Sequence, residues 1–283
     1  MKAAAFEYFA PTRLGDALAA LASGGEDARA MAGGQSLGPM LNLRLATPSL
    51  LIDITRIPEL RRTEDRGDAS FIGSTVTHAA IEDQRHALGD RGVMASVARG
   101  IAYRSVRNRG TVGGSLAHAD PAADWLTALT ALGARVAIVR RGGSRQVELS
   151  DFVRGAYATA LQPGEIVEGV LVPKLSNAAH WGYYKICRKP GEYAEAMVAV
   201  LADPERRVCR IVMGATAGAP VALDALAHRL ASQGGRAMDK ATIAEAVGAA
   251  LPEVDPIGVR VHAAAVDRAI RQVVPAAAAM AAA

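Results

Sequence analysis

The stretch that decides the fold is Ala32-Gly33-Gly34-Gln35-Ser36-Leu37, and a second glycine pair follows it in Thr111-Val112-Gly113-Gly114-Ser115. The first stretch comes after a predicted strand, and the second precedes a predicted helix. Glycine has no side chain, so backbone N–H groups in such turns can converge on phosphate oxygens, with Ser and Thr hydroxyls as further donors. Together the two turns predict a cradle for a dinucleotide.

Neither turn matches a common nucleotide-binding motif. The glycines at 33, 34 and 38 do not fit G-x-G-x-x-G, and the chain contains no G-x-x-x-x-G-K-[ST]. The sequence around the two turns is more specific than the glycines themselves. The first turn is followed by Pro39-Met40, Leu43-Arg44-Leu45 and Leu51-Ile52-Asp53-Ile54, and the second turn lies within residues 107–124.

These stretches resemble the FAD-binding medium subunit of the molybdenum hydroxylases, the group of carbon monoxide dehydrogenase and xanthine dehydrogenase. The likeness extends from about Phe6 to the C-terminal helices. It implies FAD as the cofactor of this chain. It also implies an α+β fold, with a two-lobed FAD-binding domain of the vanillyl-alcohol oxidase and xanthine dehydrogenase type and a C-terminal α+β domain in which helices cover an antiparallel sheet.

The element pattern predicts two FAD-binding lobes over 1–55 and 56–175, and a C-terminal domain over 176–283. In the first lobe, a helix over 12–24 with Thr12 as N-cap is followed by strands over 29–32 and 50–54, with the first glycine turn between them. In the second, Asp120 is expected to cap a helix with Pro121 at its first position. The C-terminal part reads as strands followed by helices, which favours a separate lobe.

Composition excludes several classes of function. With 283 residues, 51% of them hydrophobic, the chain can bury a large core. Basic residues exceed acidic ones only by 32 to 28 and aromatic residues make up 4%, so we expect no nucleic-acid binding. We find neither a secretory signal nor an apolar run that could span a bilayer, and we therefore expect a cytoplasmic protein.

No catalytic residue or metal site is predicted in this chain. Cys187 and Cys209 are too few for an iron–sulfur or zinc site, and the six histidines have no ligand spacing. No Ser-His-Asp or Cys-His arrangement stands out either. Any metal centre is therefore expected in a partner chain.

The resemblance assigns roles to individual residues. Residues 32–36 would wrap the FAD pyrophosphate, whereas Thr111, Gly113, Gly114 and Ser115 would reach the ribityl chain and the second phosphate. Further contacts are expected from Asp124 to the ribityl hydroxyls, from Lys185 near the pyrimidine edge, from the backbone at Val167 and from Tyr193 over one face of the isoalloxazine ring. For Asp124, the alternative is a carboxylate that only stabilises a helix N-terminus.

Two departures and one cluster leave questions open. Gln35 stands where the family often has histidine, and Asn42 stands where lysine is frequent. Arg104, Arg107 and Arg109 gather before the second turn. They either form a solvated face or attract the FAD phosphates or a partner subunit.

The expected function is electron transfer in a complex of three subunit types. A large subunit would hold the molybdenum cofactor and oxidise carbon monoxide, an N-heteroaromatic compound, a purine or an aldehyde. A small subunit would hold two two-iron–two-sulfur clusters, and this chain would pass their electrons through FAD to an external acceptor. A dimer of such heterotrimers is the expected assembly. The alternatives are a stand-alone FAD-dependent oxidase and a flavin-free scaffold subunit.

Overall fold

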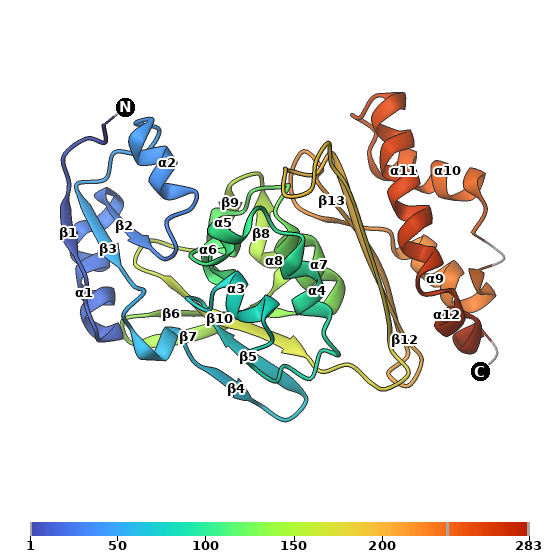
Figure 1. Cartoon of the computed structure of the whole chain (residues 1–283), viewed down its shortest axis with the longest axis horizontal. Helices are drawn as coiled ribbons and strands as arrows, with labels where there is room; N and C mark the ends of the chain where they lie inside the picture. Colours follow the sequence, from blue (N-terminus) through green and yellow to red (C-terminus); the bar gives the residue numbers. More distant parts are fainter. Residues whose placement is uncertain (1, 236–237, 282–283) are drawn as a thin grey trace.

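The structure is a computed structural model that describes residues 2–235 and 238–281. Three main sheets follow one another along the long axis, from the N-terminal lobe at the left of Figure 1 to a group of helices at the right. Each of these sheets is built from one continuous part of the chain.

The first sheet is parallel, with strand order β1-β3-β2. Helix α1 buries Ala17, Leu18 and Leu21 against it, in a core that includes Ile52. Parallel strands end at the same edge of a sheet, which is where α/β folds bind ligands. The first glycine segment begins at this edge, directly after β2. The elements are β1 (Glu7–Phe9), α1 (Leu14–Gly24), β2 (Ala28–Met31), α2 (Leu37–Asn42) and β3 (Leu50–Asp53).

The second sheet is antiparallel, with strand order β4-β5-β10-β6-β7. Its helices share a core around the fully buried Trp125. The strands are β4 (Thr63–Asp65), β5 (Ala69–Gly73), β6 (Arg135–Arg140), β7 (Gly143–Glu148) and β10 (Ile166–Pro173), with a small pair β8 (Val153–Gly155) and β9 (Ala158–Thr159). The helices are α3 (His78–Glu82), α4 (Val93–Arg99), α5 (Arg104–Arg107), α6 (Val112–His118), α7 (Asp124–Leu132) and α8 (Leu149–Phe152).

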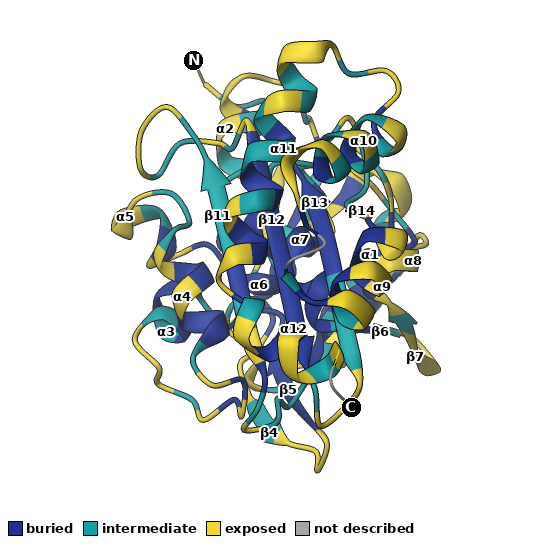
Figure 2. Cartoon of the chain, turned by 90° about the vertical axis from the view of Figure 1, so that its right-hand side faces the viewer, coloured by how far each residue is buried: buried dark blue, intermediate teal, exposed yellow. Residues whose placement is uncertain are grey.

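The third sheet is antiparallel and is covered on both faces. Helix α7 contacts β12 and β13 from the side of the second sheet, while α11 and α9 lie on the opposite face, toward the viewer in Figure 2. Every residue of β12 is therefore buried. The elements are β11 (His180–Ile186), β12 (Ala196–Asp203), β13 (Val208–Gly214), β14 (Val221–Ala222), α9 (Asp224–Gln233), α10 (Lys240–Ala250), α11 (Pro256–Arg271) and α12 (Val274–Ala281).

Three local predictions are wrong. The cap of α1 is Arg13 rather than Thr12, and its side chain makes no capping hydrogen bond. Asp120 does not cap α7, because its carboxylate accepts the N–H of Ala122 in a tight turn and α7 begins at Asp124. The second glycine pair forms no turn before a helix but lies in the first turn of α6, which Thr111 caps.

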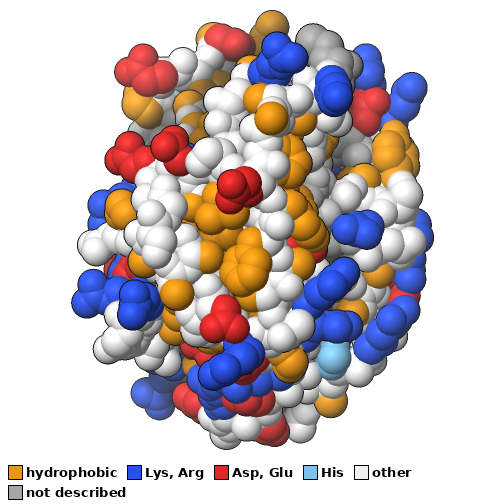
Figure 3. Space-filling view, turned by 90° about the vertical axis from the view of Figure 1, so that its left-hand side faces the viewer, with side chains coloured by type: hydrophobic (Ala, Val, Ile, Leu, Met, Phe, Trp, Pro, Cys, Tyr) orange, Lys and Arg blue, Asp and Glu red, His pale blue; other side chains and the backbone are white. Residues whose placement is uncertain are grey.

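The first lobe presents apolar side chains to the surface. Figure 3 shows them gathered near the middle of the face at the left of Figure 1. The edge strand β1 contributes to this exposure, because Tyr8 is 54% and Phe9 40% exposed. Within residues 2–235 and 238–281, no helix is long and apolar enough to cross a membrane.

Candidate FAD site

The first glycine segment carries a row of backbone N–H groups without protein partners. Among the described residues, none of the backbone N–H groups of 32–37 donates a hydrogen bond. The next N–H group, that of Gly38, donates to the carbonyl of Gly34 at 2.9 Å. Gly34 has φ +69°, a value that glycine adopts without strain. Successive N–H groups that no protein acceptor pairs can converge on an anion. The segment is thus suited to hold a pyrophosphate.

Side chains of this segment add little to the row. Gln35 is exposed, and its amide folds back to donate to the Gly33 carbonyl at 3.1 Å. Ser36 precedes α2 without capping it. The hydroxyl of Ser36 is therefore available to a ligand, whereas Gln35 orders the loop itself.

The second glycine segment uses its N–H groups inside the protein. Val112 and Gly113 donate to the carbonyls of Val76 and Ser74 at 3.1 and 3.0 Å. Gly114 donates to the Thr111 hydroxyl and Ser115 to the Thr111 carbonyl, at 3.1 and 3.0 Å. What this segment can offer a ligand is the hydroxyl of the half-buried Ser115.

The two segments touch each other. A Cβ atom at Gly33 would overlap the Arg109 carbonyl and lie 2.9 Å from the Gly110 Cα. A Cβ at Gly114 would lie 3.6 Å from that of Ala32. Glycine is therefore needed at 33 for close backbone approach. The predicted cradle residues do come together, although they contribute in different ways.

Asp124 and Lys185 lie in one buried polar cluster. Asp124 is the first residue of α7, and Lys185 reaches it from β11, with 2.8 Å between Nζ and Oδ1. Lys185 also donates to the Gly100 carbonyl at 2.8 Å. The ion pair joins the second lobe to the third sheet, so two residues predicted to contact different parts of the flavin occupy a single place.

Tyr193 and Val167 lie in contrasting surroundings. Tyr193 is 71% exposed on the loop after β11. Its pKa is raised by partial burial and by the negative charge of Asp120. The loop is seated where Gly191, with φ +88°, passes the carbonyl of Ala102. Val167 is buried in β10 beside an irregularity in its pairing with β6, so that only its backbone could reach a ligand.

The geometry agrees with a family comparison. Residues 4–175 match the model of the FAD binding domain in molybdopterin dehydrogenase. The chain belongs to the family of FAD-binding medium subunits of molybdenum hydroxylases. The match confirms FAD as the cofactor expected for this chain and identifies the medium subunit as part of an oxidoreductase.

Relatives extend the match beyond that domain. The medium subunit is 40% identical to the nicotine 6-hydroxylase medium subunit of Paenarthrobacter nicotinovorans over 221 residues, 77% of each chain. It is 37% identical to the carbon monoxide dehydrogenase medium chain of Hydrogenophaga pseudoflava over 248 residues, 87% of this chain and 84% of the relative. The predicted subunit class is thereby confirmed.

Solved structures confirm the predicted fold. A chain of carbon monoxide dehydrogenase from Hydrogenophaga pseudoflava superimposes with a TM-score of 0.86 at 32% identity, covering 99% of both chains. A chain of quinoline 2-oxidoreductase from Pseudomonas putida 86 gives 0.83 at 33% identity, covering 99% of this chain and 100% of the other. The α+β architecture of the medium subunit is that of the family.

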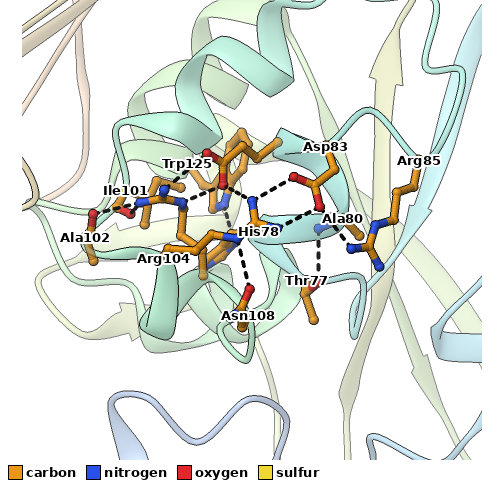
Figure 4. A network of polar contacts seen from close by, with 12 residues as sticks. Thr77, His78, Ala80, Asp83, Arg85, Ile101, Ala102, Arg104, Asn108 and Trp125 are labelled. Atoms are coloured by element: carbon orange, nitrogen blue, oxygen red, sulfur yellow. Dashed lines mark hydrogen bonds and ion pairs between the residues drawn. The ribbon is translucent and has the colours of Figure 1, made fainter.

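The arginines before the second segment serve the fold of the medium subunit. Arg107 is buried and binds both oxygens of Glu82, at 2.7 and 3.1 Å. Arg104 pairs with Glu82 and Asp83, and Figure 4 shows its contact with Asp83. The hydrogen bond from Arg107 holds the pKa of Glu82 below its usual value. Attraction of phosphate is thus not the role of these two. Arg109 takes part in none of the ion pairs of the described residues.

A buried histidine supports the second segment from behind. The backbone N–H of His78 donates to the Gly110 carbonyl at 2.9 Å, and its ring accepts from the Trp125 indole at 3.0 Å (Figure 4). Burial and the nearby Arg107 charge lower the pKa of His78 to about 4. A neutral imidazole is therefore built into the wall behind the cradle.

One contact of the polar cluster was missed by sequence reasoning. The Tyr183 hydroxyl donates to Asp124 Oδ1 at 2.8 Å. Tyr183 and Lys185 are two residues apart on β11 and thus share a face of the strand. This period of two was the available signal. No group of three or more potential metal ligands occurs within the described parts of the chain.

Proposed function

We propose that this chain is the electron-transfer subunit of a molybdenum hydroxylase complex. It receives electrons from two-iron–two-sulfur clusters on a small partner and passes them through FAD to an external acceptor, in a dimer of heterotrimers. A large partner with the molybdenum cofactor oxidises the substrate. FAD supplies the ability to exchange electrons singly or in pairs. The observation that carries the proposal is the row of N–H groups over 32–37, which donate no hydrogen bond within the described part of the chain.

This chain contributes binding and orientation. The N–H groups of 32–37 and the Ser36 hydroxyl would hold the pyrophosphate, and Ser115 would reach the remaining phosphate and ribityl region. Asp124 would accept a ribityl hydroxyl, and Lys185 would place its charge near the pyrimidine edge. Tyr193 would cover one ring face, while the backbone at Val167 would approach the ring.

For the substrate of the complex, we propose an N-heteroaromatic compound. The names of several relatives support this class, namely a nicotine 6-hydroxylase, a caffeine dehydrogenase and a quinoline 2-oxidoreductase. Carbon monoxide and glyceraldehyde dehydrogenases also match. The substrate-oxidising site would lie on the large partner, so its identity has to be established on the assembled complex.

A pull-down with a tagged chain tests the proposal. We expect FAD in this chain, molybdenum and iron in the co-purified partners, and bleaching of the flavin absorption when an N-heteroaromatic substrate is added without an acceptor. A flavin-free chain would favour the scaffold alternative. A chain that oxidises a substrate without partners would favour the stand-alone oxidase. Either result would contradict the proposal.

A further inference from the structure

The inner face of β11 carries three side chains in a row. Trp181, Tyr183 and Lys185 alternate along the strand and therefore point to the same side. The rings of Trp181 and Tyr183 stack with 6.4 Å between their centroids and 9° between their planes. The ring of Tyr183 is thus held against Trp181, and its hydroxyl contacts Asp124.

The backbone of Tyr183 is also fixed. Its N–H donates to the side-chain oxygen of Gln272, and the Gln272 amide donates to the Tyr183 carbonyl, both at 3.2 Å. This reciprocal pair ties the middle of β11 to the end of α11. A tyrosine restrained at its ring and its backbone can place its hydroxyl with little freedom.

That hydroxyl and the ammonium of Lys185 converge on one oxygen. Both donate to Oδ1 of Asp124 at 2.8 Å. Burial and the carboxylate raise the pKa of Tyr183 well above its ordinary value, so the phenol stays protonated and donates at neutral pH. The second oxygen, Oδ2, accepts no hydrogen bond from the described residues. It is also not one of their fully buried polar atoms without a partner, so it remains accessible.

We propose that Tyr183 is a positioning residue of the cofactor site, which together with Lys185 fixes Asp124 Oδ1 and so presents Oδ2 to a hydroxyl of the bound dinucleotide. With Lys185 alone, the carboxylate would keep one donor and could rotate. The inference rests on the proposed function, because it requires the dinucleotide beside Asp124.

Tyr183→Phe removes the hydroxyl and keeps the ring that stacks on Trp181. We expect the Kd for FAD of the full chain to rise about fivefold, as the loss of one net hydrogen bond implies. Fluorescence titration with FAD measures this rise in Kd, and thermal melting checks that the variant is folded.

Tyr184→Phe is the matched control. Tyr184 is the neighbouring residue of β11, faces the C-terminal helices and lies 5.0 Å beneath the guanidinium of Arg268. We expect its Kd for FAD to equal that of the parent chain. If both variants bind FAD like the parent, Tyr183 has no positioning role, although the proposed function stands. If the parent chain binds no FAD, both proposals fall.

A double variant separates positioning from mere packing. Because Tyr183 acts through Asp124 in this account, Tyr183→Phe should change the Kd little in a chain that already carries Asp124→Asn. The same fivefold effect in that background would show that Tyr183 acts elsewhere and would overturn the inference.

Discussion

The two glycine segments have similar sequences and opposite uses of their backbone. In the first, no N–H group of 32–37 has a partner among the described residues, and Gly34 takes a left-handed conformation. In the second, the N–H groups of 112–115 are bound to Val76, Ser74 and Thr111. A glycine pair can therefore serve either to expose backbone to a ligand or to let one element pass close to another.

Because the two segments use their N–H groups differently, substitutions in them should have different effects. Damage to the first segment should remove the ligand and leave the fold, because the N–H row stabilises nothing else. Damage to the second should weaken the fold first, because its hydrogen bonds join α6 to the chain after β5. The following variants separate these outcomes.

The largest effect is expected for Gly34→Val. A branched residue at φ +69° is strained and would move the N–H row, so we expect about a 100-fold loss of FAD affinity, or ~2.7 kcal/mol. Equilibrium dialysis with FAD measures the loss, and circular dichroism monitors the fold. Gly38→Ala is the control, because nothing lies within 4 Å of its added Cβ. Unchanged affinity in Gly34→Val would refute the cradle.

A pH-dependent loss of stability should follow from His78 behind the second segment. Its pKa is about 4 in the folded chain against an ordinary value of 6.5, so the unfolded chain binds a proton that the folded chain excludes. The contribution is complete above pH 6.5 and is lost on acidification toward pH 4, by up to about 3 kcal/mol.

Urea unfolding at several pH values measures this loss. The difference in unfolding free energy between the parent and His78→Asn should shrink as the pH falls from 6.5 to 4. The exposed His228→Asn serves as the control and should keep the slope of the parent. A difference between parent and His78→Asn that does not change with pH would contradict the buried neutral imidazole.

Thr111→Ala and Ser36→Ala should give opposite results. Thr111 caps α6, so its loss should lower the free energy of unfolding by about 1 kcal/mol and change FAD affinity less. Ser36 makes no capping hydrogen bond, so its loss should weaken FAD binding a few-fold without changing stability. Paired melts and FAD titrations compare them. If Thr111→Ala instead weakened FAD binding and Ser36→Ala instead lowered stability, the roles assigned to the two segments would be wrong.

The smallest effect is expected for Tyr193→Ala. The side chain is 71% exposed, so stability should hardly change, whereas loss of an aromatic contact with the flavin should weaken binding by about 0.5–1.5 kcal/mol. A titration with FAD measures the weaker binding. Flavin absorption bands, redox potential and acceptor-dependent turnover, compared at equal FAD loading, report the lost contact with the ring. If all three match those of the parent, Tyr193 lies outside the site.

Sequence reasoning located the glycine segments but not their different uses. Glycine is unfavourable inside a helix, so Gly113-Gly114 reads as a turn. The structure places the pair in α6. Glycine is required at 113 because a Cβ there would overlap Ser74. Only the partner element, distant in sequence, reveals this requirement. Asp120 was misassigned because aspartate hydrogen-bonds the backbone in the same way in a turn and at a helix cap.

The central strand β10 was also missed, although it holds the second sheet together. Its run over 166–173 contains Gly169, which weakens the strand pattern. That glycine is required because β10 passes under the ring of Phe71 on β5. The family resemblance identified Asp124 and Lys185 as separate site residues. Their ion pair and the Tyr183 contact could not be predicted, because they depend on how β11 packs against α7.

Amide hydrogen exchange with and without FAD tests the central claim most directly. We predict that FAD slows exchange strongly over 33–37, where the N–H groups have no partner in residues 2–235 and 238–281. We expect little change over 112–115, where the hydrogen bonds already exist. Equal protection of both segments, or protection of 112–115 alone, would contradict the account.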